Sequence, residues 1–356
     1  MGNAIKTFKI SYVFLPVLIG LVVVSWLFYR DFNPELFSGL HFSWRMCGGI
    51  LLAFLFIFGR DFGAMVRLRW LSDDTLTWRQ VFNVNMLCEF TSAVTPSAVG
   101  GGSLIVLFLN KEGVDAGKST ALMISCIFLD ELFFVFACPV ALLLFSFDEL
   151  FGSIGVISSG IKALFFIVYS LIVFWTLLLY VALFHRPEWV KRLLLAVFRI
   201  PLLYRWKGAV ETLTDNLVIS SHEMSHRSLL FWLKVFGMTC ISWMSRYLVV
   251  NALLVAFTTN GHQLLAFVRQ LILWIVMTVS PTPGGSGVSE YMFRVYYADF
   301  FTIGGMALLV AFIWRMITYY MYLFIGVCIL PGWLRKLKTT LFPYTTLFRS
   351  DRKSVV

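Results

Sequence analysis

The chain has 356 residues, of which 59% are hydrophobic and only 13% are charged, and its formal net charge is +10. A soluble domain carries about 25% charged residues, so this composition excludes a soluble globular protein and predicts an all-α polytopic membrane protein. The positive charge does not indicate nucleic-acid binding, because no basic patch is interleaved with base-stacking aromatic residues.

Six apolar runs have roughly the 20 residues that a membrane-spanning helix needs. They cover 10–29, 44–62, 117–146, 160–184, 229–258 and 304–330. The first run is too long for a signal-peptide core, and no small-residue cleavage site follows it, so we expect it to be retained as a span. The sequence therefore predicts about six full spans.

Two further apolar stretches, 81–110 and 264–302, are too long for one span and are interrupted near the middle by Pro and Gly. The first break reads TPSAVGGG and the second PTPGGSGVSE, and such runs stop helices. Broken backbone at bilayer depth is tolerated where it lines a wet cavity, and paired breaks in two halves indicate a transporter's binding site. The break residues that we place on the substrate path are Pro96, Gly100, Gly101, Gly102, Pro281, Pro283, Gly284, Gly285 and Gly287.

The distribution of Lys and Arg predicts the orientation. These residues are concentrated in the segments 1–9, 60–80, 185–228 and 331–338. The loops 147–159 and 259–263 contain none. Cytoplasmic loops carry an excess of Lys and Arg, so both ends should be cytoplasmic in a multi-pass protein of the cytoplasmic (inner) membrane.

Crossing parity then requires each broken stretch to enter and leave the membrane on one face, the first on the cytoplasmic side and the second on the external side. We interpret both as re-entrant hairpins with their Pro/Gly tips near the midplane; the alternative is two short crossings each, which preserves parity. The two halves, about 1–147 and 160–338, each contain two spans, a hairpin and a third span. Three crossings per half make the halves inverted, as in many secondary transporters.

We treat 1–338 as a single transmembrane domain. Residues 341–356 read LFPYTTLFRSDRKSVV, and the two parts of this string back-translate to one widely used sequencing adapter in opposite orientations. We expect this tail to be an assembly artefact and the natural C-terminus to differ from it, so the tail is excluded from the interpretation.

Six ionisable residues lie near the middle of a predicted span or beside one of the two breaks. They are Glu89, Asp130, Glu131, Arg246, Glu290 and Arg315. A charge at the bilayer centre costs about 2.5–3.5 kcal/mol on insertion scales, so such residues face the interior and either pair or bind substrate. We expect Arg246 and Arg315 to contact a lipid phosphate, with the carboxylates orienting them or carrying protons. The alternative is that pairs such as Asp130–Arg315 are structural and lock the halves together.

Two motifs are rejected on context, and a third feature stays open. Residues 222–226, HEMSH, fit a zinc-protease pattern, but no third ligand follows before His262, so we predict no metal site. The GKST at 117–120 lacks the first Gly and the preceding strand of a phosphate-binding loop, so we predict no cofactor. The basic amphipathic stretch within 185–228 is either an interfacial helix on anionic headgroups or an ordinary cytoplasmic loop.

The run from Asn83 through Pro96 and Gly100–Gly102 to Gly113, the motif PTPGGSGVSE, and Arg315 resemble the flippase-like integral membrane family. That family includes the transmembrane region of lysylphosphatidylglycerol synthases, and the resemblance covers about residues 5–338. Related chains often have an acidic residue where this one has Gly102 and Ser103, and Arg where it has Asp130 and Glu131.

The resemblance implies a protein that handles a membrane lipid with a polar or phosphate-bearing headgroup. Our first hypothesis is a flippase or translocase that is not itself an enzyme. The alternative is the membrane module of a lipid-modifying enzyme, similar to aminoacyl-phosphatidylglycerol synthases, that lacks its soluble catalytic domain or works with a separate one. A third hypothesis is a lipid-binding scaffold. The oligomeric state is not predicted.

Overall fold

The computed structural model describes residues 43–95, 104–151, 155–199, 226–259, 261–280, 284–303 and 305–341, together with Thr282 and isolated positions between 208 and 224. Apart from short connections these residues are helical, and no strand occurs among them, which confirms the all-α prediction. The predicted span 10–29 lies outside the described residues, as does nearly all of 341–356.

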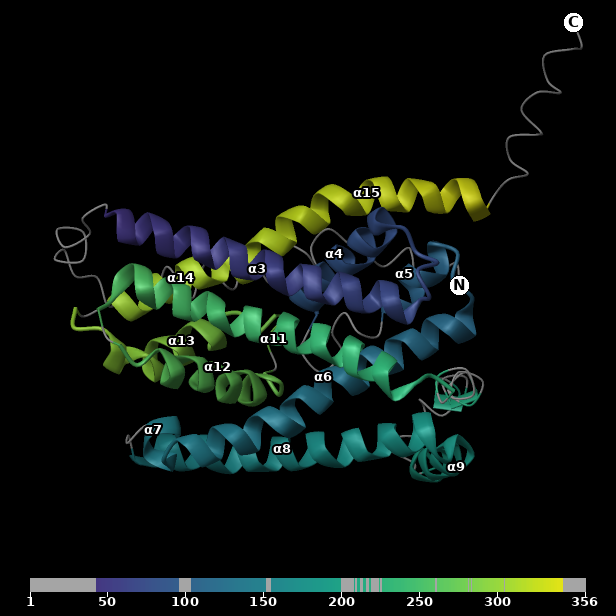
Figure 1. The fold of residues 1–356 in the computed structure, drawn as a ribbon, viewed down its shortest axis with the longest axis horizontal. Helices are drawn as coiled ribbons and strands as arrows, with labels where there is room; N and C mark the ends of the chain where they lie inside the picture. Colours follow the sequence, from purple (N-terminus) through teal and green to yellow (C-terminus); the bar gives the residue numbers. More distant parts are fainter. Residues whose placement is uncertain are drawn as a thin grey trace, which may run out of the picture.

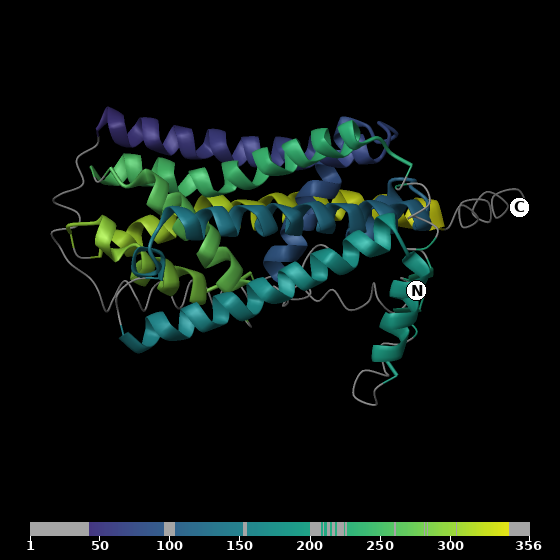
Figure 2. The same ribbon diagram turned by 60° about the horizontal axis from the view of Figure 1, so that its bottom comes forward.

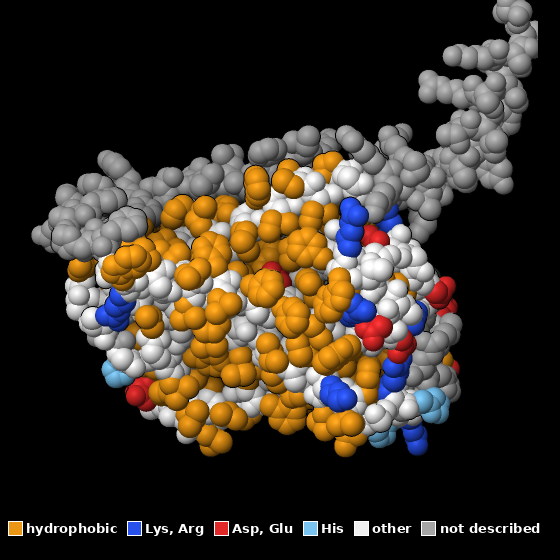
Figure 3. All heavy atoms as spheres, turned by 45° about the horizontal axis from the view of Figure 1, so that its top comes forward, with side chains coloured by type: hydrophobic (Ala, Val, Ile, Leu, Met, Phe, Trp, Pro, Cys, Tyr) orange, Lys and Arg blue, Asp and Glu red, His pale blue; other side chains and the backbone are white. Residues whose placement is uncertain are grey.

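Long helices run side by side along the longest axis of the molecule (Figure 1). Those that are long and apolar enough to cross a membrane are α3 (Trp44–Leu71), α6 (Ala116–Leu144), α8 (Gly155–Phe184), α11 (Leu229–Phe257) and the run of α14 (Met306–Arg315), a π-helical turn η5 (Met316–Tyr320) and α15 (Met321–Leu341). Each of the five coincides with a predicted span. Hydrophobic side chains cover the middle of the face shown in Figure 3, whereas Lys and Arg gather mainly at one end of it, as expected for a bilayer-embedded surface.

Helix α3 corrects one sequence prediction. The apolar run was expected to end near residue 62 and to be followed by a basic loop, but the helix continues to Leu71. Arg60 is therefore buried in the helix. Arg67 lies two helical turns further along, on the same face of the helix. Both arginines have carboxylate partners on neighbouring helices, so their charges do not force the chain out of the membrane-spanning segment.

The close packing of α3 on α11 depends on small residues. A Cβ atom at Gly49 would lie 2.6 Å from the Cβ of Ala256, and one at Gly63 would lie 2.9 Å from the carbonyl oxygen of Met238. The contacts run in opposite directions along the two helices, so α3 and α11 are antiparallel. Small residues that let helix backbones approach closely are the usual basis of helix association in membranes.

Both broken stretches form two short helices, as their Pro/Gly content predicts. The first contains α4 (Trp78–Val94) and α5 (Ile105–Lys111), and the second contains α12 (Gln263–Met277), α13 (Val288–Tyr296) and the 3₁₀ turn η4 (Ala298–Phe300). The two pairs lie toward opposite ends of the molecule (Figure 1). This placement agrees with an inverted arrangement, while the re-entrant course of each stretch stays a prediction.

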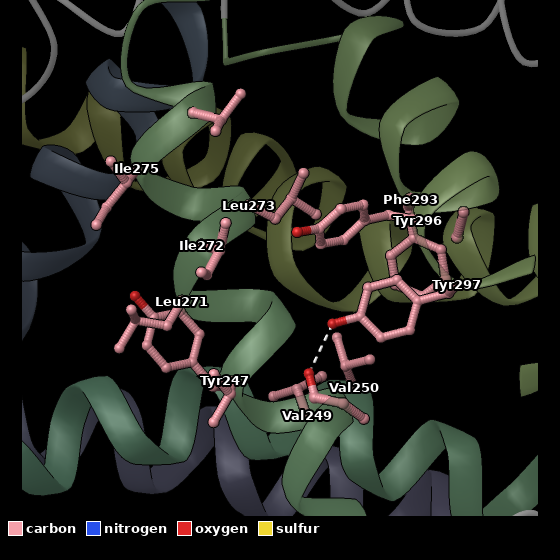
Figure 4. Packing of buried hydrophobic residues seen from close by; sticks show 14 of the residues in the cluster. Tyr247, Val249, Val250, Leu271, Ile272, Leu273, Ile275, Phe293, Tyr296 and Tyr297 are labelled. Atoms are coloured by element: carbon pink, nitrogen blue, oxygen red, sulfur yellow. Dashed lines mark hydrogen bonds between the residues drawn. The ribbon is translucent and has the colours of Figure 1, made fainter. Parts of the chain in front are cut away.

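The core around the second stretch is aromatic. The rings of Phe293, Tyr296 and Tyr297 on α13 and just beyond it pack beside apolar side chains of α12 (Figure 4). The Tyr297 hydroxyl donates a hydrogen bond of 2.7 Å to the carbonyl of Ala266, so a buried polar atom is satisfied within the core.

Two short helices complete the described fold. Helix α7 (Phe147–Phe151) lies beside the start of α8 (Figure 1). Helix α9 (Pro187–Val197) follows the end of α8, and the chain there turns and runs across the end of the bundle (Figure 2).

Candidate functional site

The two helix breaks meet inside the bundle. The backbone N–H of Gly284 in the second break donates a hydrogen bond of 3.2 Å to the carbonyl of Thr95 in the first. Tyr319, in the π-helical turn, donates from its hydroxyl to the carbonyl of Ala93 at 3.1 Å and accepts a hydrogen bond from Ser286. A π-helical turn is often found at a functional site, and here it holds the two breaks together. Several break residues that were predicted to line the substrate path lie outside the described residues: Pro96, Gly100, Gly101, Gly102, Pro281 and Pro283.

A buried ion pair forms just after the second break. Arg315 donates from Nε to the carboxylate of Glu290 at 3.0 Å and from its terminal nitrogen to the carbonyl of Gly284 at 3.0 Å. Glu290 is 0% exposed and also accepts hydrogen bonds from the backbone N–H of Gly287 and the hydroxyl of Ser289. Glu290 therefore caps the first turn of α13, and its remaining charge is matched by Arg315.

Glycine conformation shapes this segment. Gly284, Gly285 and Gly287 have positive φ angles of 56°, 70° and 82°, which L-residues with side chains rarely adopt. A Cβ at Gly284 would also lie 2.2 Å from the ring of Tyr319. The glycines predicted from the sequence thus allow the second break to turn tightly against the end of α4.

A first cavity of about 240 Å³ opens between the breaks. Its wall combines polar groups with a large aromatic and apolar surface. The residues that line it include Glu89, Ser92, Arg246, Gln270, Trp274, Gly284, Gly285, Trp314, Arg315, Tyr319 and Tyr322.

A second cavity of about 180 Å³ lies among α3, α4, α6 and α11, and its wall is richer in charged and polar groups. These groups are Arg60, Arg67, Asn85, Glu89, Ser92, Asp130, Ser242 and Arg246. Glu89, Ser92 and Arg246 line both cavities, so the two spaces share one wall.

The charges of the second cavity are mostly paired. Arg60 forms an ion pair with Glu89, and Arg67 forms a two-pronged ion pair with Asp130. The indole N–H of Trp243 donates to the same Asp130 carboxylate at 2.8 Å. These pairs join α3 to α4 and to α6 at membrane depth, where an isolated charge is costly.

Arg246 differs from the other arginines of the two cavities in that it contacts aromatic rings and no described carboxylate. Its guanidinium lies over the indole of Trp274, 4.0 Å from the ring centre, and over that of Trp243 at 5.4 Å. In the part of the chain that the structure describes, no carboxylate lies within ion-pair distance of it, whereas Arg60, Arg67 and Arg315 each have at least one. Arg246 is thus held by aromatic rings on the shared wall, where Glu89 also lies but forms its ion pair with Arg60.

The structure brings most of the described candidate residues together. Glu89, Arg246, Gly284, Gly285 and Arg315 line the first cavity, and Asp130 lines the second. Glu131, the next residue of α6, lines neither cavity. The alternative pair Asp130–Arg315 is wrong, because Asp130 pairs with Arg67 and Arg315 pairs with Glu290.

Sequence reasoning missed several residues of the site. Arg60 and Arg67 were assigned to a loop, although their seven-residue spacing, which is two helical turns, could have indicated a common helix face. Tyr319, Trp243 and Trp274 carry no signal in a single sequence, because aromatic residues are frequent throughout this chain.

Outside the membrane-spanning segments, one charged cluster joins three elements at the end of the bundle that contains the last turn of α3. Asp73, in the loop after α3, accepts hydrogen bonds from Arg227 at 2.7 Å and from Lys118 at 3.4 Å. These bonds, those from Arg227 above all, hold the pKa of the Asp73 carboxyl below its ordinary value. The cluster therefore links the loop to the starts of α6 and α11.

Comparison with known proteins agrees with this architecture. A membrane protein of Archaeoglobus fulgidus, described as a UPF0104 membrane protein, is 28% identical over 251 residues, which are 68% of this chain and 73% of that protein. No solved structure matches. The family described as the lysylphosphatidylglycerol synthase TM region matches residues 13–326, which include both breaks and every described residue of the two cavities. The chain therefore belongs to the lysylphosphatidylglycerol synthase transmembrane-region family of multi-pass membrane proteins.

Proposed function

We propose that this protein is a flippase or translocase that moves a lipid with a phosphate-bearing or otherwise polar headgroup across the membrane. The observation that carries the proposal is Arg246, a cation on the wall common to two cavities that has no described carboxylate partner. A cation kept at membrane depth needs a counter-charge, and a lipid phosphate passing between the cavities supplies one.

The chemistry of Arg246 suits a phosphate. A guanidinium offers several N–H donors in a planar fork that matches two phosphate oxygens, and it is less strongly hydrated than an ammonium group. Stacking on Trp274 fixes the plane of the guanidinium, so less conformational freedom is lost when an anion binds. By contrast, Arg315 is engaged by Glu290 and by the carbonyl of Gly284, which favours a supporting role in the second break.

The predicted inverted repeat supports a special role for Arg246. Arg60 and Arg246 lie equally far from the last residues of α3 and α11, Leu71 and Phe257, so the two arginines occupy corresponding positions. Glu89, the partner of Arg60, precedes Thr95 of the first break, and the residue at the same distance before Thr282 is the apolar Val276. In the first half Glu89 neutralises Arg60, whereas the second half has no carboxylate at the corresponding position to neutralise Arg246.

The cavities support a path for the headgroup alone. Polar groups line the shared wall and the second cavity, while the outer faces of the long helices carry exposed apolar side chains. In the proposed mechanism the headgroup passes the shared wall between the two breaks while the acyl chains remain in the bilayer. Orientation, direction and energy source are not part of the proposal.

The test is lipid translocation in proteoliposomes that contain the full chain. A fluorescent phospholipid and a fluorescent glycolipid without phosphate are each followed by a quencher added outside. We expect Arg246→Ala to slow phospholipid translocation by about 10-fold to 100-fold, the value of a charge-assisted hydrogen bond, and Arg246→Lys to retain part of the rate. The matched control is Lys234→Ala, which removes an exposed cation of the same helix, α11, and should leave the rate unchanged.

Translocation at the wild-type rate by folded Arg246→Ala would contradict the proposal. The family description names a synthase, which keeps a second candidate function in view: a membrane module that presents lipid to a separate lipid-modifying enzyme. Saturable phospholipid binding that depends on Arg246 without any translocation would favour this second function.

A further inference from the structure

Helix α9 lies where the bundle meets the membrane surface. Helix α8 has the length and apolarity of a span and ends at Phe184, and α9 begins at Pro187. Three peptide units reach about 11 Å at most, so the start of α9 cannot lie far from the headgroup layer. The chain there runs across the end of the bundle instead of continuing along it (Figure 2).

The two sides of α9 differ in character. Leu194, like Phe184 and Trp232, packs against one buried apolar cluster of the bundle, so one side of the helix is attached to the bundle. His185 and Glu188 are also exposed, but five of the exposed residues in and beside α9 recur with helical spacing and are here called the α9 surface: Arg186, Trp189, Arg192, Ala196 and Arg199.

The charge of the α9 surface is positive. Within the described residues, none of its three arginines forms an ion pair with a carboxylate, and Lys191 beside them is paired with Asp215. The one acidic residue of the helix, Glu188, lies in the first turn, where it favours the helix dipole. Trp189 is 48% exposed, and Trp is enriched at the level of lipid headgroups because its ring is apolar and its N–H is polar.

We propose that the α9 surface is a binding site for the anionic headgroups of the adjacent leaflet. The occupant is a lipid surface and not a protein, because an arginine-rich face with a single aromatic residue, adjacent to the end of a span, matches the headgroup layer in both charge and position. This inference does not depend on the translocation of any lipid. It resolves the two interpretations of the basic stretch within 185–228 in favour of the interfacial helix.

The experiment is hydrogen exchange of the full chain in nanodiscs, either of phosphatidylcholine alone or with 30% phosphatidylglycerol as the probe. We expect the amides of α9 to exchange more slowly in the anionic nanodiscs, and this protection to fall by about fivefold for each arginine removed in Arg186→Gln, Arg192→Gln and Arg199→Gln. Raising the salt concentration should reduce the protection, because exposed charges are screened. Lys162→Gln, near the opposite end of α8, is the matched control and should keep the wild-type protection.

Equal exchange of α9 in the two kinds of nanodisc would overturn the proposal, as would protection by anionic lipid that survives in the triple variant. Amides of α3 and α11 in the same experiment show whether each variant is folded, and the single variant Arg192→Gln serves if the triple variant is not. No step of the test measures transport, so its failure would leave the proposed function untouched.

Discussion

The N–H of Gly284 donates a hydrogen bond to the carbonyl of Thr95, which joins the backbones of the two helix breaks directly. Helix ends leave backbone groups unpaired, and such groups are costly at membrane depth. Each break therefore satisfies a backbone group of the other. The contact is close because Gly284 has no side chain: an added Cβ would lie 2.2 Å from the ring of Tyr319 and 2.8 Å from the carbonyl oxygen of Ala93.

We predict that Gly284→Ala is strongly destabilising. The residue has a φ of 56°, which costs an L-residue about 1–2 kcal/mol, and the clash with backbone adds about 1–3 kcal/mol. The control is Gly113→Ala, because Gly113 also has a positive φ, 97°, but has open space around its Cβ position. Thermal unfolding in detergent should show a clearly larger loss for Gly284→Ala. Equal losses would mean that the contact between the breaks contributes nothing beyond backbone strain.

Much of the fold could be predicted from the sequence, because two physical signals are strong in a membrane protein. Apolar runs of membrane length located the five described spans, and clusters of Pro and Gly located both breaks. The end of α3 was not predicted, because the excess of Lys and Arg in cytoplasmic loops cannot distinguish a loop arginine from a buried, paired one. Arg60 and Arg67 are paired by Glu89 and Asp130, which are far from them in the chain.

Several charged residues of the candidate site could be predicted from the sequence, but their pairing could not. Charged residues in apolar segments are conspicuous, so Glu89, Asp130, Arg246, Glu290 and Arg315 could be selected from sequence alone. Their pairing is set by tertiary packing, which a single sequence does not encode visibly. The distinction between the paired Arg315 and Arg246, which has no described carboxylate partner, emerges only when the neighbouring helices are in place.

The pair Glu290–Arg315 should be essential to the second break. We predict that Arg315→Ala destabilises the protein by about 3–5 kcal/mol, because it leaves the fully buried Glu290 carboxylate without its counter-charge. Adding Glu290→Gln should recover part of the loss, since the neutral amide no longer needs the guanidinium. A double-mutant cycle of thermal unfolding measures this coupling. Additive losses would show that the two side chains stabilise the break independently.

The packing of α3 on α11 offers a test with adjacent residues. Gly49→Ala should destabilise by about 1–3 kcal/mol, because the new methyl group would lie 2.6 Å from the Cβ of Ala256. Gly48 has nothing within 4 Å of its Cβ position, so Gly48→Ala should be neutral or stabilising by up to about 1 kcal/mol through helix propensity. The comparison of the two unfolding temperatures cancels the propensity term. If both variants were stabilised, the helices would not be in contact at Gly49.

The Asp73 cluster predicts a dependence of stability on pH. Hydrogen bonds from Arg227 lower the pKa of Asp73 below its ordinary value of 3.8, so the carboxylate is favoured more strongly in the folded protein than in the unfolded chain. Its contribution is therefore fully present above pH 3.8 and is lost as the pH falls through the lower, folded pKa. Because Asp73 is 41% exposed, we expect only about 0.5 kcal/mol, as for other solvent-exposed pairs.

Asp73→Asn is the sharpest variant for this test. Asp73 has a φ of 59°, and Asn also tolerates this left-handed conformation, so the substitution removes the charge without adding backbone strain. The variant should be slightly less stable than the wild type at pH 7, and the difference should disappear at a pH below the folded pKa. Arg79→Gln removes a charge from a nearby exposed position that forms no ion pair with a described carboxylate, and it should leave the pH profile unchanged. A constant difference between Asp73→Asn and the wild type at every pH would exclude the carboxylate charge as the cause and would assign the effect to the shape of the loop.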